Sequence, residues 1–349
     1  MSVLDNLPLI VPYNMGGGGN SKVLPLHADG ILFRKSDNSI HQYRGVTGFQ
    51  LLNLFERGQD IDSFLNTFNR SNTVRIFWYT PEKEWGNKFW DLPSAERLIA
   101  FHNYLEGRGF YVENTCATDN DSSKVGDIKN LIVWLNNAGL SNALLEAVNE
   151  PFVKGDDDKL DPSLFKNVLN NSPYLYTSGV YQYESLDKFF GKYAVDHSPR
   201  DFEWPRKAKD LQDYTSLFKV PAVQDEPIKP GEAGYNILDY YTYGACSGLF
   251  GSGCLFHYLS GEFGQLPNEQ EMNCYNAMMD GLDVFPLDAC LGSYEHLRDM
   301  ERVDAEGNPT ACLRVFRKGQ FAIIIRNKSV DIPSNWTALD SKQVCYKIG

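Results

Sequence analysis

The sequence predicts an α/β fold, a (β/α)8 TIM barrel with small antiparallel β additions at the N- and C-termini. The first observation is a set of eight short apolar segments, rich in β-branched and aromatic residues, most of which are separated by helical segments. The second is the length of 349 residues, which suits a barrel with additions. Strands that alternate with helices form a parallel sheet, and eight of them can close into a barrel. An open doubly wound sheet is the alternative, but the sequence lacks the glycine fingerprint of that fold.

The predicted strands and helices follow one another in a regular order. The eight strands are YRGVT (43–47), TVRIFWY (73–79), FYVENT (110–115), ALLEAV (143–148), YLYTSG (174–179), YAVDH (193–197), VPAVQ (220–224) and SGCLFHY (252–258). Helices are predicted at 60–70, 92–109, 125–139, 205–218, 234–247 and 268–282. The connection between the fifth and sixth strands is short, so we expect a short helix there, at 184–191.

The chain divides into three parts. Residues 1–41 form a leader and a β-hairpin, residues 42–289 the barrel, and residues 290–349 a small β appendage. The run MGGGGNSK (15–22) lacks the spacing of a phosphate loop and is expected to be a flexible leader. The appendage contains a hairpin of period-two strands that can pair with the N-terminal hairpin. We expect it to be structural and to pack on the side of the barrel; carbohydrate binding is the alternative.

Composition excludes several classes of partner. A net charge of −12 without a basic cluster argues against nucleic acid, and no apolar stretch is long enough to span a membrane. The N-terminus has no secretion signal, which leaves a cytoplasmic or a released, virion-associated location open. The seven cysteines form no metal-ligand pattern, so we expect free thiols, no metal and no cofactor. We expect a monomer.

Three glutamates lie at the ends of predicted strands, where a barrel of this type carries its active site. Glu113 ends the third strand, Glu150 follows the fourth in NEP, and Glu226 follows the seventh in DEP. Two carboxyl groups that face one bond are what glycoside hydrolysis needs, one protonated and one ionised. Arg75, at the centre of the second strand, can keep one of them ionised, although a purely structural ion pair is the alternative.

The segment AVNEP (147–151), the strand TVRIFWY with its arginine and the glutamate after the seventh strand together resemble clan A of the glycoside hydrolases, most closely its family-5-like, cellulase-type members. The resemblance covers residues 29–260. It implies that Glu150 is the acid/base, that Glu226 is the nucleophile bonded to Arg75, and that Asn149 holds the sugar 2-hydroxyl. His197, on the sixth strand, would complete the site. A retaining pair of this kind lies about 5 to 5.5 Å apart.

Other residues fit this interpretation less closely. The tryptophan that often follows strand eight in such enzymes has no counterpart, and His257 or Tyr258 can line the floor instead. Four tryptophans lie in or beside strand-end loops, where we expect two of them to contact sugar: Trp78, Trp85, Trp90 and Trp204. Trp134 lies in a helical stripe and is expected in the core. The acidic run at 154–161 lacks a calcium-binding loop and is expected to be solvated.

The sequence therefore predicts a retaining glycoside hydrolase that cleaves a β-linked oligo- or polysaccharide. Two alternatives stay open. One is a non-catalytic glycan-binding barrel of a phage or surface recognition protein, which would bind glycans without releasing reducing sugar. The other is a transglycosylase that uses the same residues, which only the length of its products would distinguish.

Overall fold

The fold is a nearly closed barrel of eight parallel strands, as predicted, with a small antiparallel sheet on each side of it in the sequence. The computed structural model describes residues 23–79, 91–118, 121–151, 160–179, 187–197, 204–225, 237–287, 294–297, 301–303, 309–326 and 332–349. Within these residues, no helix is both long and apolar enough to cross a membrane.

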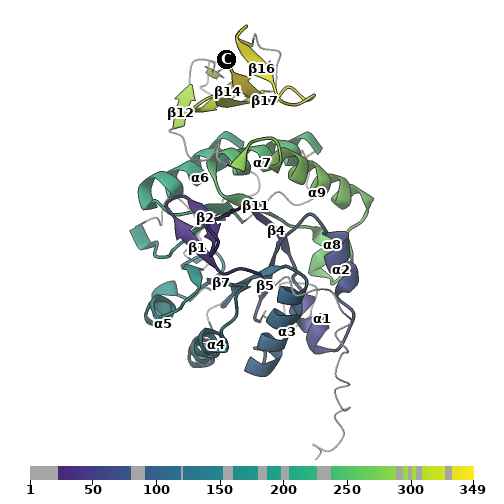
Figure 1. Cartoon of the computed structure of the whole chain (residues 1–349), viewed down its shortest axis with the longest axis vertical. Coiled ribbons are helices and arrows are strands. Elements are labelled where there is room, and N and C mark those ends of the chain that lie inside the picture. Colours follow the sequence, from purple (N-terminus) through teal and green to yellow (C-terminus); the bar gives the residue numbers. More distant parts are fainter. Residues whose placement is uncertain are drawn as a thin grey trace, which may run out of the picture.

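All eight predicted barrel strands are present, with ends that differ by a few residues. They are β4 (Tyr43–Thr47), β5 (Thr73–Phe77), β6 (Tyr111–Thr115), β7 (Ala143–Glu146), β8 (Leu175–Thr177), β9 (Ala194–Asp196), β10 (Ala222–Gln224) and β11 (Gly253–Phe256). They pair in parallel in the order β8-β7-β6-β5-β4-β11-β10-β9. The ring of strands is visible in Figure 1, surrounded by helices.

The barrel is least regular between β8 and β9. These two strands do not form a ladder, and the backbone joins them through a bridge between Thr177 and Gly191 and a 2.8 Å hydrogen bond from Lys192 N–H to the carbonyl of Tyr176. Of the helix expected at 184–191, only the part from Asp187 is described, and that part contains no α-helix. The ring of strands is therefore not fully closed between β8 and β9.

The helices cover the outside of the barrel. They are α1 (Leu51–Glu56), α2 (Asp62–Thr67), α3 (Ala95–Gly107), α4 (Val125–Ala138), α5 (Lys166–Asn170), α6 (Trp204–Phe218), α7 (Ile237–Phe250), α8 (Leu259–Glu262) and α9 (Glu269–Leu282). Helix α4 shows why such segments are amphipathic, since its Leu131, Ile132 and Leu135 are buried against the strands. The prediction that Trp134 lies in the core is wrong, because its side chain is 54% exposed. It points away from the face of the helix that carries the buried residues.

The predicted N-terminal hairpin is present and closes the base of the barrel. It consists of β2 (Leu32–Lys35) and β3 (Ile40–His41), and β1 (Leu26–Asp29) adds a third antiparallel strand. Phe33 is fully buried and packs against Tyr43 and Tyr193 at the starts of two barrel strands. The hairpin thus seals the apolar lumen from the end opposite the carboxyl ends of the strands.

The appendage forms a sheet of its own. Its strands are β12 (Tyr294–Leu297), β13 (Glu301–Val303), β14 (Pro309–Lys318), β15 (Phe321–Arg326), β16 (Trp336–Ala338) and β17 (Cys345–Ile348), and β14 and β15 form the predicted hairpin. The predicted pairing with the N-terminal hairpin is wrong, because the two hairpins belong to separate sheets. Each hairpin buries its apolar residues against a different part of the barrel instead.

The C-terminal sheet lies beyond the helices α6, α7 and α9 in Figure 1. The Phe321 ring meets Phe285, which follows α9, edge to face at 5.6 Å between ring centroids. The Lys342 ammonium lies 3.7 Å from the centroid of the Tyr241 ring on α7. Phe321 and Ile323 are buried in the same apolar cluster as α7 and α9. The appendage therefore packs on the side of the barrel.

Deleting residues 290–349 is expected to lower the stability of the barrel. The deletion exposes the apolar surface that Phe321 and Ile323 cover, and each such side chain is worth about 1.5 to 3 kcal/mol when buried. A loss of more than about 3 kcal/mol in the free energy of unfolding should appear in urea titration. A truncated protein that keeps its stability but loses affinity for a ligand would show that the appendage is a binding module instead.

Candidate active site

A layer of polar side chains lies across the barrel at the carboxyl ends of the strands. Side chains of a strand alternate between the lumen and the outside, so residues two positions apart share a face. The lumen is filled by an apolar cluster that includes Leu144, Val195, Val223 and Leu255. Two positions further along the same strands come Glu146, His197, Asp225 and His257. The barrel core thus ends in a layer of acids and histidines, each no more than 3% exposed.

Arg75 is the centre of this layer. It lies on β5, is 1% exposed, and its Nη2 donates to Glu146 Oε2 at 2.6 Å and to Asn149 Oδ1 at 2.8 Å. Its Nε lies 3.0 Å from Asp225 Oδ2 and donates to Thr115 Oγ1 at 3.1 Å. One guanidinium group therefore connects the ends of four strands.

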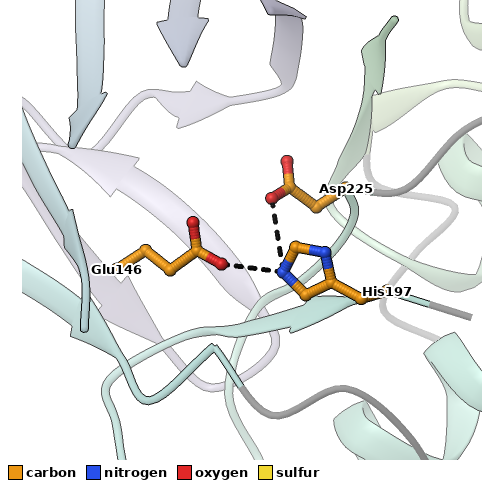
Figure 2. A group of neighbouring side chains, drawn as sticks. All are labelled: Glu146, His197 and Asp225. Atoms are coloured by element: carbon orange, nitrogen blue, oxygen red, sulfur yellow. Dashed lines mark hydrogen bonds and ion pairs between the residues drawn. The ribbon is translucent and has the colours of Figure 1, made fainter. Parts of the chain in front are cut away.

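His197 joins the same two acids from another side. Figure 2 shows its imidazole between Glu146 and Asp225. Its Nε2 lies 2.7 Å from Glu146 Oε1 and 3.7 Å from Asp225 Oδ2. His197 thus makes its short contact with Glu146.

The two acids are held in different protonation states. Burial alone would raise the pKa of Glu146, but Arg75 and then His197 lower it to about 2. Burial raises the pKa of Asp225 well above its usual range, and Arg75 offsets this only in part. Glu146 is therefore the ionised partner of Arg75, and Asp225 favours the neutral form. A pair of acids with separated pKa values is the arrangement that acid/base chemistry uses.

Glu146, His197 and Asp225 also have the ligand types of a metal site, with one atom of each within 4.8 Å of the others. Arg75 already places a positive charge 2.6 Å from Glu146 and 3.0 Å from Asp225. A divalent cation between these acids would meet that charge at short range. The donor set fits a guanidinium-centred network, and a metal does not fit with it.

The chain after β7 turns sharply to present Asn149 and Glu150. The strand ends at Glu146, two residues earlier than predicted, and Glu150 has a φ of +47°, in the left-handed region that few residues other than glycine adopt. Gly179 makes room for the turn, because a Cβ there would lie 1.8 Å from the carbonyl oxygen of Val148. Strain of this kind is retained where the surrounding structure fixes it, and it is frequent at functional sites.

The turn places the two side chains next to each other. Asn149 donates its backbone N–H to the carbonyl of Ala117 at 2.8 Å, and its Nδ2 lies 3.4 Å from Glu150 Oε2. Glu150 is partly exposed, whereas Arg75 below it is buried. Among Glu146, Glu150 and Asp225, Glu150 is therefore the acid whose carboxyl group can reach a ligand above the barrel.

The structure corrects the prediction for Glu113. It lies in the middle of β6 rather than at the end of the strand, and it is completely buried in the lumen. Its carboxylate accepts hydrogen bonds from the hydroxyls of Tyr43 and Tyr193, the latter at 2.5 Å. Glu113 pairs with Leu144, two positions before Glu146, so it lies one layer below that acid, where it cannot contact a substrate.

Trp78 is also misplaced by the sequence prediction. Its ring is completely buried in the main apolar cluster, and its Nε1–H donates to Asn114 Oδ1 at 3.0 Å. It follows β5 directly and points away from the lumen, so it offers no face to a sugar. Glu226, Trp85, Trp90 and the side chain of Trp204 lie outside the described residues.

His257 follows β11 directly and forms part of the floor of the candidate site. Its Nδ1 lies 3.1 Å from Thr47 Oγ1, and its ring meets Phe49 edge to face at 4.4 Å between centroids. Tyr258, the other residue considered for this place, faces outward and stacks on Phe256 at 6.0 Å. Strand alternation decides between the two neighbours.

Glu146 and Asp225 are the residues that sequence reasoning missed. The NEP and DEP motifs pointed instead to Glu150 and Glu226, the glutamates before proline. The available signal was the strand period: both acids stand two positions after an apolar lumen residue, so both had to point inward. The bond between Arg75 and Glu226 that the resemblance implies stays a prediction, because Glu226 lies outside the described residues. The described partners of Arg75 include these two acids, Asn149 and Thr115.

Known structures share this fold over most of the chain. No sequence-family comparison and no comparison with curated proteins gives a match. A protein from Bacteroides vulgatus that is named only provisionally as a glycoside hydrolase superposes with a TM-score of 0.55 at 14% identity, covering 88% of this chain and 68% of that one. A glycoside hydrolase family 5 protein from the same organism gives 0.54 at 12% identity, covering 86% and 79%. A β-glucanase from Saccharophagus degradans, solved in complex with cellotetraose, gives 0.51 at 12% identity, covering 77% and 99%. The chain has the (β/α)8 barrel fold that these glycoside hydrolases share.

Proposed function

We propose that this protein is a retaining glycoside hydrolase that cleaves a β-linked oligo- or polysaccharide. The observation that carries the proposal is the strained turn that presents Asn149 and Glu150 above the Arg75 network at the carboxyl ends of the barrel strands. This is the end of the barrel where enzymes with this fold carry their active sites. The similar structures, among them a β-glucanase solved with cellotetraose, support the same class of substrate.

In this proposal Glu150 is the acid/base. It protonates the leaving oxygen in the first step and activates water in the second. Glu226 is the nucleophile, and its carboxylate attacks the anomeric carbon to form a glycosyl-enzyme. Asn149 holds the 2-hydroxyl of that sugar through its Nδ2. Its Oδ1 already accepts from Arg75, so the amino group, which contacts Glu150, is the part of the amide that faces the substrate.

The direct test is hydrolysis of a panel of aryl β-glycosides and of plant, algal and bacterial polysaccharides. We expect release of reducing sugar with retained anomeric configuration, observed by NMR at early reaction times. Binding of glycans without any release would identify a non-catalytic recognition barrel. Inverted configuration in the first product would contradict the double displacement.

Replacing Glu150 by alanine should affect substrates according to their leaving groups. Poor leaving groups should lose on the order of 10²- to 10⁴-fold in kcat, because they need the proton, whereas activated aryl glycosides should lose far less. Added azide should accelerate the variant and give a β-glycosyl azide, since azide needs no general base. The exposed Glu269, at the start of α9, provides a control, and its alanine variant should behave as wild type. Equal losses on all substrates would contradict the acid/base role.

A further inference from the structure

Glu146 lies beneath the proposed reacting groups and is saturated with hydrogen bonds. Its Oε2 accepts from Arg75 Nη2 at 2.6 Å and from Thr115 Oγ1 at 2.6 Å, while its Oε1 lies 2.7 Å from His197 Nε2. It is completely buried, so it does not touch a substrate. Any influence on the reaction must pass through the groups that it holds.

Arg75 provides the connection to Asn149. A single amino group, Nη2, donates one hydrogen to Glu146 Oε2 and the other to Asn149 Oδ1, at 2.6 and 2.8 Å. Because the guanidinium is planar and rigid, the bond to Glu146 fixes the direction of the second hydrogen. That hydrogen selects the orientation of the Asn149 amide, with Oδ1 toward Arg75 and Nδ2 toward Glu150.

Asp225 is the second acid beside the same cation. Its Oδ2 is 3.0 Å from Arg75 Nε and 3.7 Å from His197 Nε2, the two groups that Glu146 also contacts. Burial is the main cause of the raised pKa of Asp225, and the charge of Glu146 adds to it. If Glu146 lost that charge, Asp225 would ionise more readily and would be the nearest carboxylate to Arg75 among the described residues. Arg75 would then turn toward β10 and away from Asn149.

We propose that Glu146 is a positioning residue, which holds Arg75 against Asn149 Oδ1 and away from Asp225, so that the Asn149 amino group faces the substrate. This inference rests on the proposed function for its kinetic consequence. Its geometric part, the orientation of Asn149 through Arg75, does not.

The kinetic test compares Glu146→Gln with Glu113→Gln in the full chain. Both replace a completely buried acid by its amide, but Glu113 accepts its hydrogen bonds from two tyrosines and acts on Arg75 only through its charge. We expect Glu146→Gln to lower kcat/KM by about 10- to 100-fold, the equivalent of one charge-assisted hydrogen bond. Glu113→Gln should change kcat/KM less than about 3-fold. Equal losses in the two variants would overturn the proposal, because they would reflect a general effect of buried acids.

A double-mutant cycle separates positioning from other roles of Glu146. If Glu146 acts through Asn149, then adding Glu146→Gln to Asn149→Ala should cost little more than Asn149→Ala alone. Additive losses would contradict the proposal. Should Glu146→Gln fail to fold, Glu146→Asp keeps the charge but withdraws the carboxylate by one methylene, and the same cycle applies.

A crystal structure of Glu146→Gln tests the geometry without any substrate. We expect the contact between Arg75 Nη2 and Asn149 Oδ1 to open beyond hydrogen-bonding distance as Arg75 turns to Asp225. An unchanged contact would overturn the proposal even if the enzyme is active. Conversely, a displaced Arg75 in a protein that hydrolyses no glycoside would support the positioning role and reject only the proposed function.

Discussion

Replacing Glu226 by alanine is expected to abolish turnover of every substrate, by on the order of 10⁴- to 10⁶-fold, because no glycosyl-enzyme can form without the nucleophile. The loss should be similar for good and poor leaving groups, in contrast to that of Glu150→Ala. With an activated aryl β-glycoside, added azide should attack directly and give the α-glycosyl azide, since one displacement inverts the configuration. Product analysis by NMR measures this outcome.

The neighbouring Asp225 supplies the control for this experiment. It points into the barrel beside Arg75 and is completely buried, and its high pKa, raised by burial, makes it a poor nucleophile. Asp225→Ala should therefore yield no α-glycosyl azide. If it did, and Glu226→Ala kept substantial turnover, the role of nucleophile would pass from Glu226 to Asp225.

Replacing Arg75 by methionine is expected to destabilise the fold by about 3 to 5 kcal/mol, the cost of leaving a buried charge without its partner. Arg75 is 1% exposed, and it is the cation 2.6 Å from the fully buried Glu146. Methionine fills a similar volume, so the loss reflects charge rather than a cavity. Urea titration at pH 7 gives the free energy of unfolding.

The effect of Arg75→Met should depend on pH in a defined direction. The pKa of Glu146 is about 2 in the folded protein against an ordinary 4.5, so its ion pair contributes stability that is complete above pH 4.5 and is lost toward pH 2. The difference between wild type and variant should therefore shrink as the pH falls through this range. Arg108→Met is the control, because the ion pair of Arg108 with Asp62 is 40% and 29% exposed and is worth less than about 1 kcal/mol. A loss below 1 kcal/mol for Arg75→Met would contradict the assigned charge of Glu146.

The positions of the barrel strands along the chain could be predicted, because they depend on the local pattern of apolar residues and strand breaks. Segments such as TVRIFWY and ALLEAV combine β-branched or apolar residues with clear breaks, and both proved to be strands. The sequence could not show whether the two terminal hairpins pair with each other, because the edge of a strand does not specify which sheet it joins. Phe33 packs in the apolar cluster of the barrel lumen and Phe321 in the cluster that includes α7 and α9, and only the folded barrel brings each of these clusters together.

The sequence by itself determined the eight alternating strands, because their period and their breaks depend on neighbouring residues. It also placed Asn149, Glu150 and His197 at or near the carboxyl ends of their strands, and Arg75 at the centre of the second strand. Only the tertiary structure decided which acids share Arg75. Glu146 and Asp225 are 79 positions apart and meet because both point into the lumen, from the ends of β7 and β10. Glu113 pairs with Leu144, two positions before Glu146, so it lies one layer lower. Contacts across a closed barrel depend on register and tilt, which no stretch of sequence specifies alone.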